Sequence, residues 1–388
     1  MQTSYIHRNI EAELKECLRE FPAVAVLGPR QCGKSTLAQK IITEVKDAIY
    51  LDLENPNDLA KLQAAELFFN QHSDKLICLD EIQCLPEIFT QLRAIIDSRK
   101  RNNQFLFLGS ASRDLIKQSS ESLAGRIAYL ELTPLLYSEV DATDAITRDV
   151  IWQRGGFPDS LLARSERSSR RWRENFIRTF LERDIPQLGF RIPAPTLRKV
   201  WQMCAHNQGQ LLNSSQLGSS LGVSHTTFRS YIDLLSETFM LRVLPPYAAN
   251  LGKRLVKSPK VYLRDTGILH ALLAIDTFED LMGHPILGQS WETFAMETII
   301  ASFPGWESYF YRTASGVEID LVLVRGNRKI AFEFKVSATP TLTKGFWTGL
   351  EDLNIERAWI IAPVKESYPI HDKVSVSPLG EILSDGIG

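Results

Sequence analysis

The chain has 388 residues, of which 44% are hydrophobic and 23% are charged, and its formal net charge is −2. This is the composition of an ordinary globular protein, and the length predicts about two to four domains. No apolar run approaches about 18 residues, so we expect no membrane span and no membrane partner. Five cysteines without a Cys-x-x-Cys pair argue against structural zinc, and with the lack of a signal-peptide pattern they predict a cytoplasmic location.

Residues 28–35 match the complete phosphate-loop pattern G-x-x-x-x-G-K-[ST]. The loop follows the apolar run 24–27, which predicts a buried parallel strand, and a helical pattern begins at Lys34. A strand, a glycine-rich turn and a helix N-terminus together aim backbone N–H groups at phosphate oxygens. We expect Lys34 to contact the β- and γ-phosphates and Ser35 to bind Mg²⁺. The residues predicted to bind ATP in this loop are Gly28, Pro29, Arg30, Gln31, Cys32, Gly33, Lys34, Ser35 and Thr36.

A second apolar run, residues 75–79, ends in Asp80 and Glu81. In open α/β sheets, ligands bind in the crevice at the carboxyl ends of the strands. Asp80 is therefore predicted to hold Mg²⁺ through its water shell, and Glu81 to polarise the attacking water. The alternative is that both carboxylates merely end a strand. A third run, 105–108, leads to Ser110, for which contact with the γ-phosphate and an ordinary helix N-cap are both open.

Residues 1–145 alternate short apolar runs with amphipathic stretches, which predicts an α/β core with a parallel sheet. Further strands are expected at 50–53 and 130–135. Residues 146–195 are expected to form a helical linker or lid. Its segment 164–173 is dense in arginine, for which a solvated helix face and phosphate contact both remain open.

Residues 196–250 predict a winged helix-turn-helix, with helices at 214–221 and 225–235 and a wing strand at 240–246. Such a motif can place its second helix in the major groove of DNA. Arg229 is the single strong cation on the face that this helix would present, so this face offers little positive charge for contact with DNA phosphates. A winged helix that serves only for packing is the alternative.

The last part of the chain, 251–388, carries a second set of charged side chains. Asp320 lies on one predicted strand and Glu333 with Lys335 on the next, after a tight turn. Residues two apart on a strand share a face. Together with Glu292, on the helix expected at 287–302, these side chains predict a tentative divalent-metal site that could orient water at a phosphodiester. A salt-bridged hairpin edge is the alternative.

Together, these motifs resemble a family of prokaryotic AAA-type P-loop ATPases whose C-terminal half carries an uncharacterised domain. The resemblance rests on residues 28–35, 79–83, 109–112, 122–126, 181–185, 291–294, 316–320 and 333–335. It implies an ATPase sheet, a winged-helix module and a last α/β domain, 251–388, that looks like the restriction-endonuclease fold with its Asp and Glu-x-Lys signature. It also implies that Arg126 contacts the γ-phosphate, within one subunit or across a ring interface of a homo-oligomer. An arginine that only closes a loop is the alternative.

The sequence therefore predicts an ATPase that uses ATP and Mg²⁺ and acts on, or is regulated by, DNA. An ATP-dependent regulatory or protein-interaction switch without nuclease activity is the first alternative. A scaffold that binds nucleotide without hydrolysing it is the second.

Overall fold

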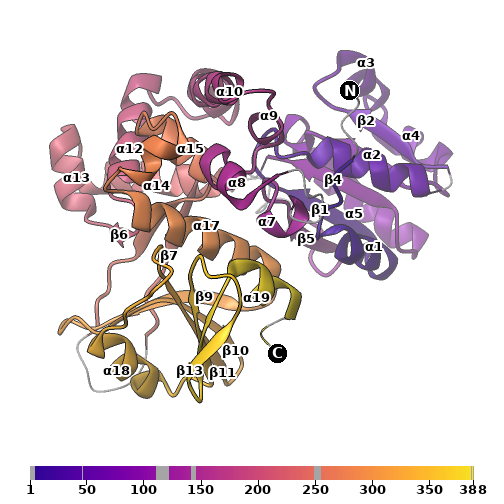
Figure 1. Ribbon diagram of the computed structural model, residues 1–388. Coiled ribbons are helices and arrows are strands. Elements are labelled where there is room, and N and C mark those ends of the chain that lie inside the picture. Colours follow the sequence, from indigo (N-terminus) through magenta and orange to yellow (C-terminus); the bar gives the residue numbers. More distant parts are fainter. Residues whose placement is uncertain are drawn as a thin grey trace. The chain divides into compact units, whose positions relative to one another are not determined.

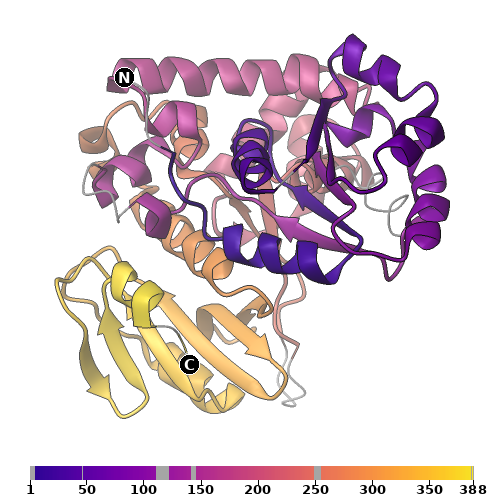
Figure 2. The same cartoon turned by 90° about the vertical axis from the view of Figure 1, so that its right-hand side faces the viewer.

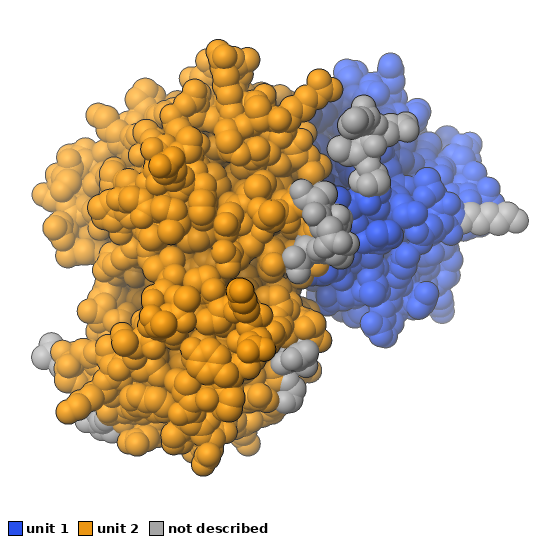
Figure 3. Space-filling view, in the orientation of Figure 1, with its two compact units in different colours: residues 1–135, 237–239 blue, residues 136–236, 240–388 orange. Residues whose placement is uncertain are grey.

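The computed structural model describes residues 5–45, 47–110, 122–140, 146–248, 255–385 and 387. The chain divides into two compact units (Figures 1 and 3). Unit 1 comprises residues 1–135 and 237–239, and unit 2 comprises residues 136–236 and 240–388. None of the helices in the described ranges combines the length and the apolar character needed to cross a membrane.

Unit 1 is built on a five-stranded parallel sheet in the order β2-β3-β4-β1-β5. Side chains of β1 alternate between two apolar clusters, with Ala25 in one and Val26 in the other, so both faces of the sheet are covered. The strands are β1 (Ala23–Leu27), β2 (Ile49–Asp52), β3 (Ile77–Asp80), β4 (Phe105–Gly109) and β5 (Ile127–Glu131). The predicted parallel ATPase sheet is confirmed, although the closing strand ends at Glu131 because its partner β1 ends at Leu27.

Helices of unit 1 begin where the sequence gives local start signals. The side chain of Asn55 accepts a hydrogen bond from Asn57 N, and Pro56 occupies the first turn of the following helix. The helices are α1 (Glu11–Glu20), α2 (Lys34–Glu44), α3 (Pro56–Lys61), α4 (Ala65–Gln71), the short η1 (Ile82–Cys84) and α5 (Ile88–Arg99).

The first part of unit 2 is mainly helical and shares one apolar core that runs from Phe157 to Leu272. Its three-stranded sheet has the order β6-β8-β7, with β6 (Gln210–Leu211), β7 (Leu241–Leu244) and β8 (Lys260–Leu263). Because β8 pairs with both other strands, the domain boundary expected at residue 250 cuts through this sheet. The helices are α7 (Tyr137–Val140), α8 (Arg148–Arg154), α9 (Pro158–Leu161), α10 (Glu166–Thr179), the π-helical turn η3 (Phe180–Asp184), α11 (Ile185–Gln187), α12 (Ala194–His206), α13 (Ser214–Leu221), α14 (His225–Glu237), α15 (Thr266–Leu272) and α16 (Phe278–Met282).

The C-terminal part of unit 2 holds a six-stranded mixed sheet, coloured orange and yellow in Figure 2. Strands β9, β10 and β11 are antiparallel, whereas β11, β12 and β14 are parallel. Gly326, with φ of 60°, makes the tight turn between β10 and β11. The elements are α17 (Leu287–Ser302), β9 (Glu307–Arg312), β10 (Glu318–Arg325), β11 (Arg328–Phe334), α18 (Lys344–Leu353), β12 (Arg357–Ile361), β13 (Tyr368–His371), β14 (Val374–Ser377) and α19 (Leu379–Asp385).

Candidate nucleotide site

The phosphate loop joins the carboxyl end of β1 to the N-terminus of α2. Gly33 has a φ of +103°, in the left-handed region that favours glycine. A Cβ at Gly28 would lie 2.1 Å from the carbonyl oxygen of Leu132, and Gly28 N donates to Gly109 O over 3.3 Å. Both glycines of the motif are therefore required by the backbone path.

Lys34 is buried in the first turn of α2, with 5% of its surface exposed. Its ammonium donates to two carbonyl oxygens of the loop, Gly28 O at 3.0 Å and Pro29 O at 2.8 Å. The positive charge of Lys34 is thus held within the phosphate loop. A terminal phosphate would replace these carbonyl acceptors with stronger, anionic ones.

Arg8 stabilises the phosphate loop through hydrogen bonds to backbone carbonyls, a role that sequence reasoning missed. Its guanidinium donates to Cys32 O at 3.1 Å and to Thr133 O at 2.6 Å, and the residue is 6% exposed. It joins the N-terminal segment, the phosphate loop and the segment after β5. No local pattern around Arg8 signals this role, because its acceptors are backbone atoms distant in sequence.

Ser35 and Asp80, the two predicted magnesium ligands, both lie near the side chain of Tyr50. Asp80 ends β3 and is 3% exposed, and the Tyr50 hydroxyl on the neighbouring strand β2 donates to its Oδ2. Ser35 lies close enough to Tyr50 to lower its pKa, against the larger raising effects of burial and Asp80. Burial and the Asp80 carboxylate raise the pKa of Tyr50, so its hydroxyl stays protonated. A hydroxyl beside a carboxylate is a donor set that suits Mg²⁺.

Replacing Tyr50 by Phe is expected to raise the Mg²⁺ concentration needed for half-maximal binding of a fluorescent ATP analogue by about 10-fold, because hydrogen-bond partners of metal ligands orient those ligands. The measurement is a Mg²⁺ titration of analogue fluorescence. Tyr129→Phe, an exposed tyrosine on β5, is the matched control. Superimposable Mg²⁺ curves for Tyr50→Phe and the wild type would show that Tyr50 does not orient the ligands.

Glu81 follows Asp80 in a left-handed backbone conformation, with φ of 53° and ψ of 47°, a strained arrangement that recurs at functional sites. Gln83 Nε2 donates to Glu81 Oε2 and also to Ser110 Oγ, the latter over 3.1 Å. Burial raises the pKa of Glu81, against the lowering effect of Lys34 and Gln83. A raised pKa suits a general base.

The chain Glu81–Gln83–Ser110 connects the carboxyl ends of β3 and β4. It places Ser110 beside the acidic pair, as the sequence suggested, while its contact with a γ-phosphate stays a prediction. The alternative, that Ser110 is the N-cap of a helix, depends on residues 111–121, which lie outside the described residues. Gln83 was missed, although a polar residue two positions after Glu81 was a usable signal.

The structure also shows the surroundings of the remaining residues that were predicted to bind ATP. Arg30 forms an ion pair with Glu54 over 2.6 Å, Cys32 is buried and its Sγ lies 3.5 Å from Leu132 O, and Thr36 is exposed on α2. Gln31 adopts a left-handed φ of 61°. Their predicted nucleotide contacts remain predictions.

Comparison with known proteins places this geometry in a family. Two uncharacterized proteins, from Mycobacterium bovis and Mycobacterium tuberculosis, are each 41% identical to the chain over 379 residues, covering 98% of it and 85% of theirs. The chain belongs to their family. Within it, residues 20–141 match the model of an AAA domain, and residues 148–279 and 287–382 match two domains of unknown function, DUF8612 and DUF4143.

A solved structure, the Walker-type ATPase of Pyrococcus abyssi, is similar to 70% of this chain and 97% of its own, with a TM-score of 0.50 and 14% identity. At that identity the likeness shows the fold alone. Together with the match to the AAA domain, this shows that unit 1 has a P-loop AAA ATPase fold.

Arg126 does not lie near the phosphate loop of its own AAA domain. Ala23 N, at the start of β1, donates to Arg126 O, whereas the loop follows the far end of β1, about 16 Å away. The guanidinium pairs with Asp97 over 2.6 Å, and its NH1 donates to Ala124 O over 2.8 Å. This geometry disfavours contact between Arg126 and the γ-phosphate within its own subunit, because the residue precedes its strand. Contact across a subunit interface stays a prediction.

The C-terminal charged residues come together in the DUF4143 region, although not as expected. Continuing the β10–β11 register from Leu321 and Phe332 by one step sets Asp320 opposite Glu333. Asp320 Oδ2 accepts from Phe334 N over 3.1 Å, and Lys335 Nζ donates to Glu333 Oε1 over 2.7 Å.

Lys260, on β8, enters this group from the preceding sheet. Its Nζ lies 2.8 Å from Glu318 Oε1, 3.8 Å from Glu292 Oε1 and 3.9 Å from Asp320 Oδ1, and the residue is 3% exposed. We call Lys260 with these three carboxylates the lysine cluster. Glu292, Asp320 and Glu318 raise the pKa of Lys260 although burial by itself would lower it.

Two glutamates here have raised pKa values: Glu292, a member of the lysine cluster, and Glu333, on the neighbouring strand β11. Burial, reinforced by Asp320, raises the pKa of Glu292 to about 7 and that of Glu333 to about 8. Over the described ranges, no group of three or more His, Cys, Asp or Glu is placed to hold a metal ion. The ammonium of Lys260 lies beside Glu292 and Asp320, so metal binding by Asp320, Glu333 and Glu292 stays a prediction that this lysine disfavours.

The predicted recognition helix of the winged helix, α14, also departs from expectation. Its N-terminus is capped by Ser224, whose Oγ accepts from Thr227 N over 3.1 Å. Arg229 pairs with Asp233 on the same helix over 3.0 Å. The strong cation on which the DNA prediction depended is thus partly neutralised.

Proposed function

We propose that the AAA domain binds ATP and hydrolyses it to ADP and phosphate with Mg²⁺. The observation that carries this proposal is the convergence of the catalytic groups at one edge of the parallel sheet. Lys34 lies in the phosphate loop after β1, and Ser35, Asp80 and Glu81 lie beside it, with Tyr50 hydrogen-bonded to Asp80 and close to Ser35.

In this mechanism the loop N–H groups and Lys34 hold the β- and γ-phosphates in a fixed orientation. Ser35 and Asp80 would hold Mg²⁺, which supplies charge neutralisation at the phosphate oxygens when bound. Glu81 accepts a proton from the water whose oxygen forms the new bond to the γ-phosphorus. The bond from that phosphorus to the bridging oxygen breaks, and ADP leaves with the electron pair.

Replacing Lys34 by Ala is expected to weaken ATP binding by roughly 10- to 100-fold, because one charge-assisted hydrogen bond to phosphate contributes about 1.5–3 kcal/mol. Binding is measured with a fluorescent ATP analogue and turnover by phosphate release. Lys40→Ala, in the same helix but paired with Glu44, should bind as the wild type does. A wild-type protein that binds no ATP at any Mg²⁺ concentration would overturn the proposal.

For unit 2, the lysine cluster favours the regulatory or protein-interaction switch over cleavage of DNA. A buried ammonium already neutralises the carboxylates that would otherwise attract a divalent cation. In the proposed switch, ATP turnover changes which partner the C-terminal part binds. Metal-dependent nicking of plasmid DNA by the wild type, lost on replacement of Glu333, would instead favour cleavage.

A further inference from the structure

One face of α10 carries arginine side chains that are directed away from the core. Arg167, Arg171 and Arg178 are exposed and are separated by four and then seven positions. At the pitch of an α-helix they fall within about 40° of one another around the axis and span about 16 Å. We call these three residues the arginine stripe.

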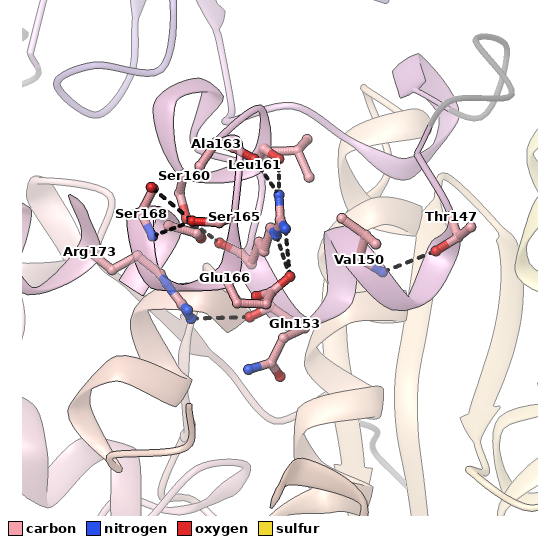
Figure 4. Close-up of polar contacts among 12 residues, drawn as sticks. Thr147, Val150, Gln153, Ser160, Leu161, Ala163, Ser165, Glu166, Ser168 and Arg173 are labelled. Atoms are coloured by element: carbon pink, nitrogen blue, oxygen red, sulfur yellow. Dashed lines mark hydrogen bonds and ion pairs between the residues drawn. The ribbon is translucent and has the colours of Figure 1, made fainter. Parts of the chain in front are cut away.

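The opposite side of α10 fixes the rotation of the helix. Arg173 is fully buried, and its NH1 donates to Gln153 O at 3.2 Å and to Gly267 O at 3.1 Å. Ser169 Oγ hydrogen-bonds with Ser160 Oγ over 2.8 Å. Figure 4 shows Arg173 directed at Gln153, with the Ser165 cap at the start of the helix. The stripe therefore cannot turn inward.

Two carboxylates of α10 have partners other than the stripe arginines. Glu166 pairs with Arg154 over 2.6 Å. Glu174 lies on the same face as the stripe, three positions after Arg171 and four before Arg178, but its printed partner is Arg170, at 3.9 Å. Arg170 also pairs with Asp276.

The stripe itself is not neutralised by any of these acids. Within the described ranges Arg167 and Arg171 form no ion pair, and Arg178 hydrogen-bonds only the neutral side chain of Asn175. On a chain with a net charge of −2, three arginines on one helix face, against the single carboxylate of Glu174, are a local excess of positive charge.

We propose that the arginine stripe binds the sugar-phosphate backbone of nucleic acid. The guanidinium fork matches phosphate oxygens in a bidentate geometry. Duplex DNA carries one charge per about 1.7 Å of its axis, so a stripe about 16 Å long faces several phosphates. Phe176 and Ile177 of α10 are buried in the core and Trp172 packs against it, which leaves no exposed apolar face to insert into a lipid surface.

This binding would not depend on base sequence, because phosphate contacts carry no base information. It also differs from the winged-helix prediction, in which Arg229 on α14 would supply the charge. The inference goes beyond ATP hydrolysis and holds whether or not nucleotide is turned over.

The test compares the full-length wild type with the triple variant Arg167→Ala/Arg171→Ala/Arg178→Ala. Fluorescence anisotropy would follow binding to labelled duplex DNAs of unrelated sequence, and to RNA, over a series of salt concentrations. We expect the slope of log K against log salt to fall in magnitude by about 2–3, since each lost phosphate contact removes about 0.9. Alanine keeps the helix favourable, and circular dichroism would confirm that the variant folds.

Two single variants serve as matched controls. Arg170→Ala removes an arginine of the same helix that is already paired with Asp276, and Arg229→Ala removes the cation of α14. Both should keep the wild-type salt slope. An unchanged slope in the triple variant, a loss carried by Arg229→Ala alone, or wild-type binding to anionic lipid vesicles but not to nucleic acid would each overturn the proposal.

Discussion

Replacing Glu81 by Gln is expected to leave ATP binding intact while lowering ATP turnover by about 10²- to 10⁴-fold, the usual contribution of a positioned general base. The amide has the same shape and can still hydrogen-bond with Gln83, but it cannot accept a proton from water. The measurements are phosphate release under saturating ATP and the affinity for a fluorescent ATP analogue.

A matched control for this change is Glu66→Gln, an exposed glutamate on α4, which should hydrolyse ATP at the wild-type rate. Because burial raises the pKa of Glu81, wild-type turnover should increase with pH as the carboxylate form becomes populated. Turnover by Glu81→Gln at the wild-type rate would remove Glu81 from the role of base.

The second large effect is expected at Lys260. Replacing it by Ala should lower the free energy of unfolding of unit 2 by about 3–5 kcal/mol near pH 8, because buried carboxylates lose the ammonium that neutralises them. Chemical denaturation followed by circular dichroism measures the change. Lys365→Ala, an exposed lysine in the segment before β13, should change the stability by no more than about 0.5 kcal/mol.

The cost of losing Lys260 should depend on pH in a definite direction. Glu292 and Glu333 have folded-state pKa values of about 7 and about 8, above the usual value of about 4.3. Their contribution to stability is full below that usual value and is lost as pH rises through 7 and 8. Lys260 lowers the pKa of Glu292, so its removal raises that pKa further, and the variant should be closest to the wild type near about pH 5.5, where Glu292 is protonated in both folded proteins. A pH-independent difference would contradict this account.

Much of unit 1 could be predicted because its signals are local. Lys34 and Asp80 each follow an apolar run that ends at the same edge of the sheet, so their meeting required only the rule for parallel strands. Tyr50, Gln83 and Arg8 were missed for the opposite reason. Their importance depends on which backbone and side-chain atoms the folded chain brings beside them.

Arg126 and the lysine cluster show where sequence reasoning fails. Arg126 follows the predicted strand 105–108 and Ser110 in the sequence, but a residue that precedes a parallel strand lies at the edge opposite the ligand crevice. Asp320 and Glu333 were correctly placed on neighbouring strands. Lys260, however, reaches Asp320 from a different sheet, and nothing in its local sequence indicates that partnership.

Residues 237–239 make the first unit discontinuous in sequence. They belong to unit 1, and Phe239 packs against its apolar core, although both flanking segments belong to unit 2. A fragment that stopped at residue 135 would leave part of that core uncovered. Any exchange of this ATPase module between proteins, by recombination or by engineering, would have to carry two separate pieces of the chain together.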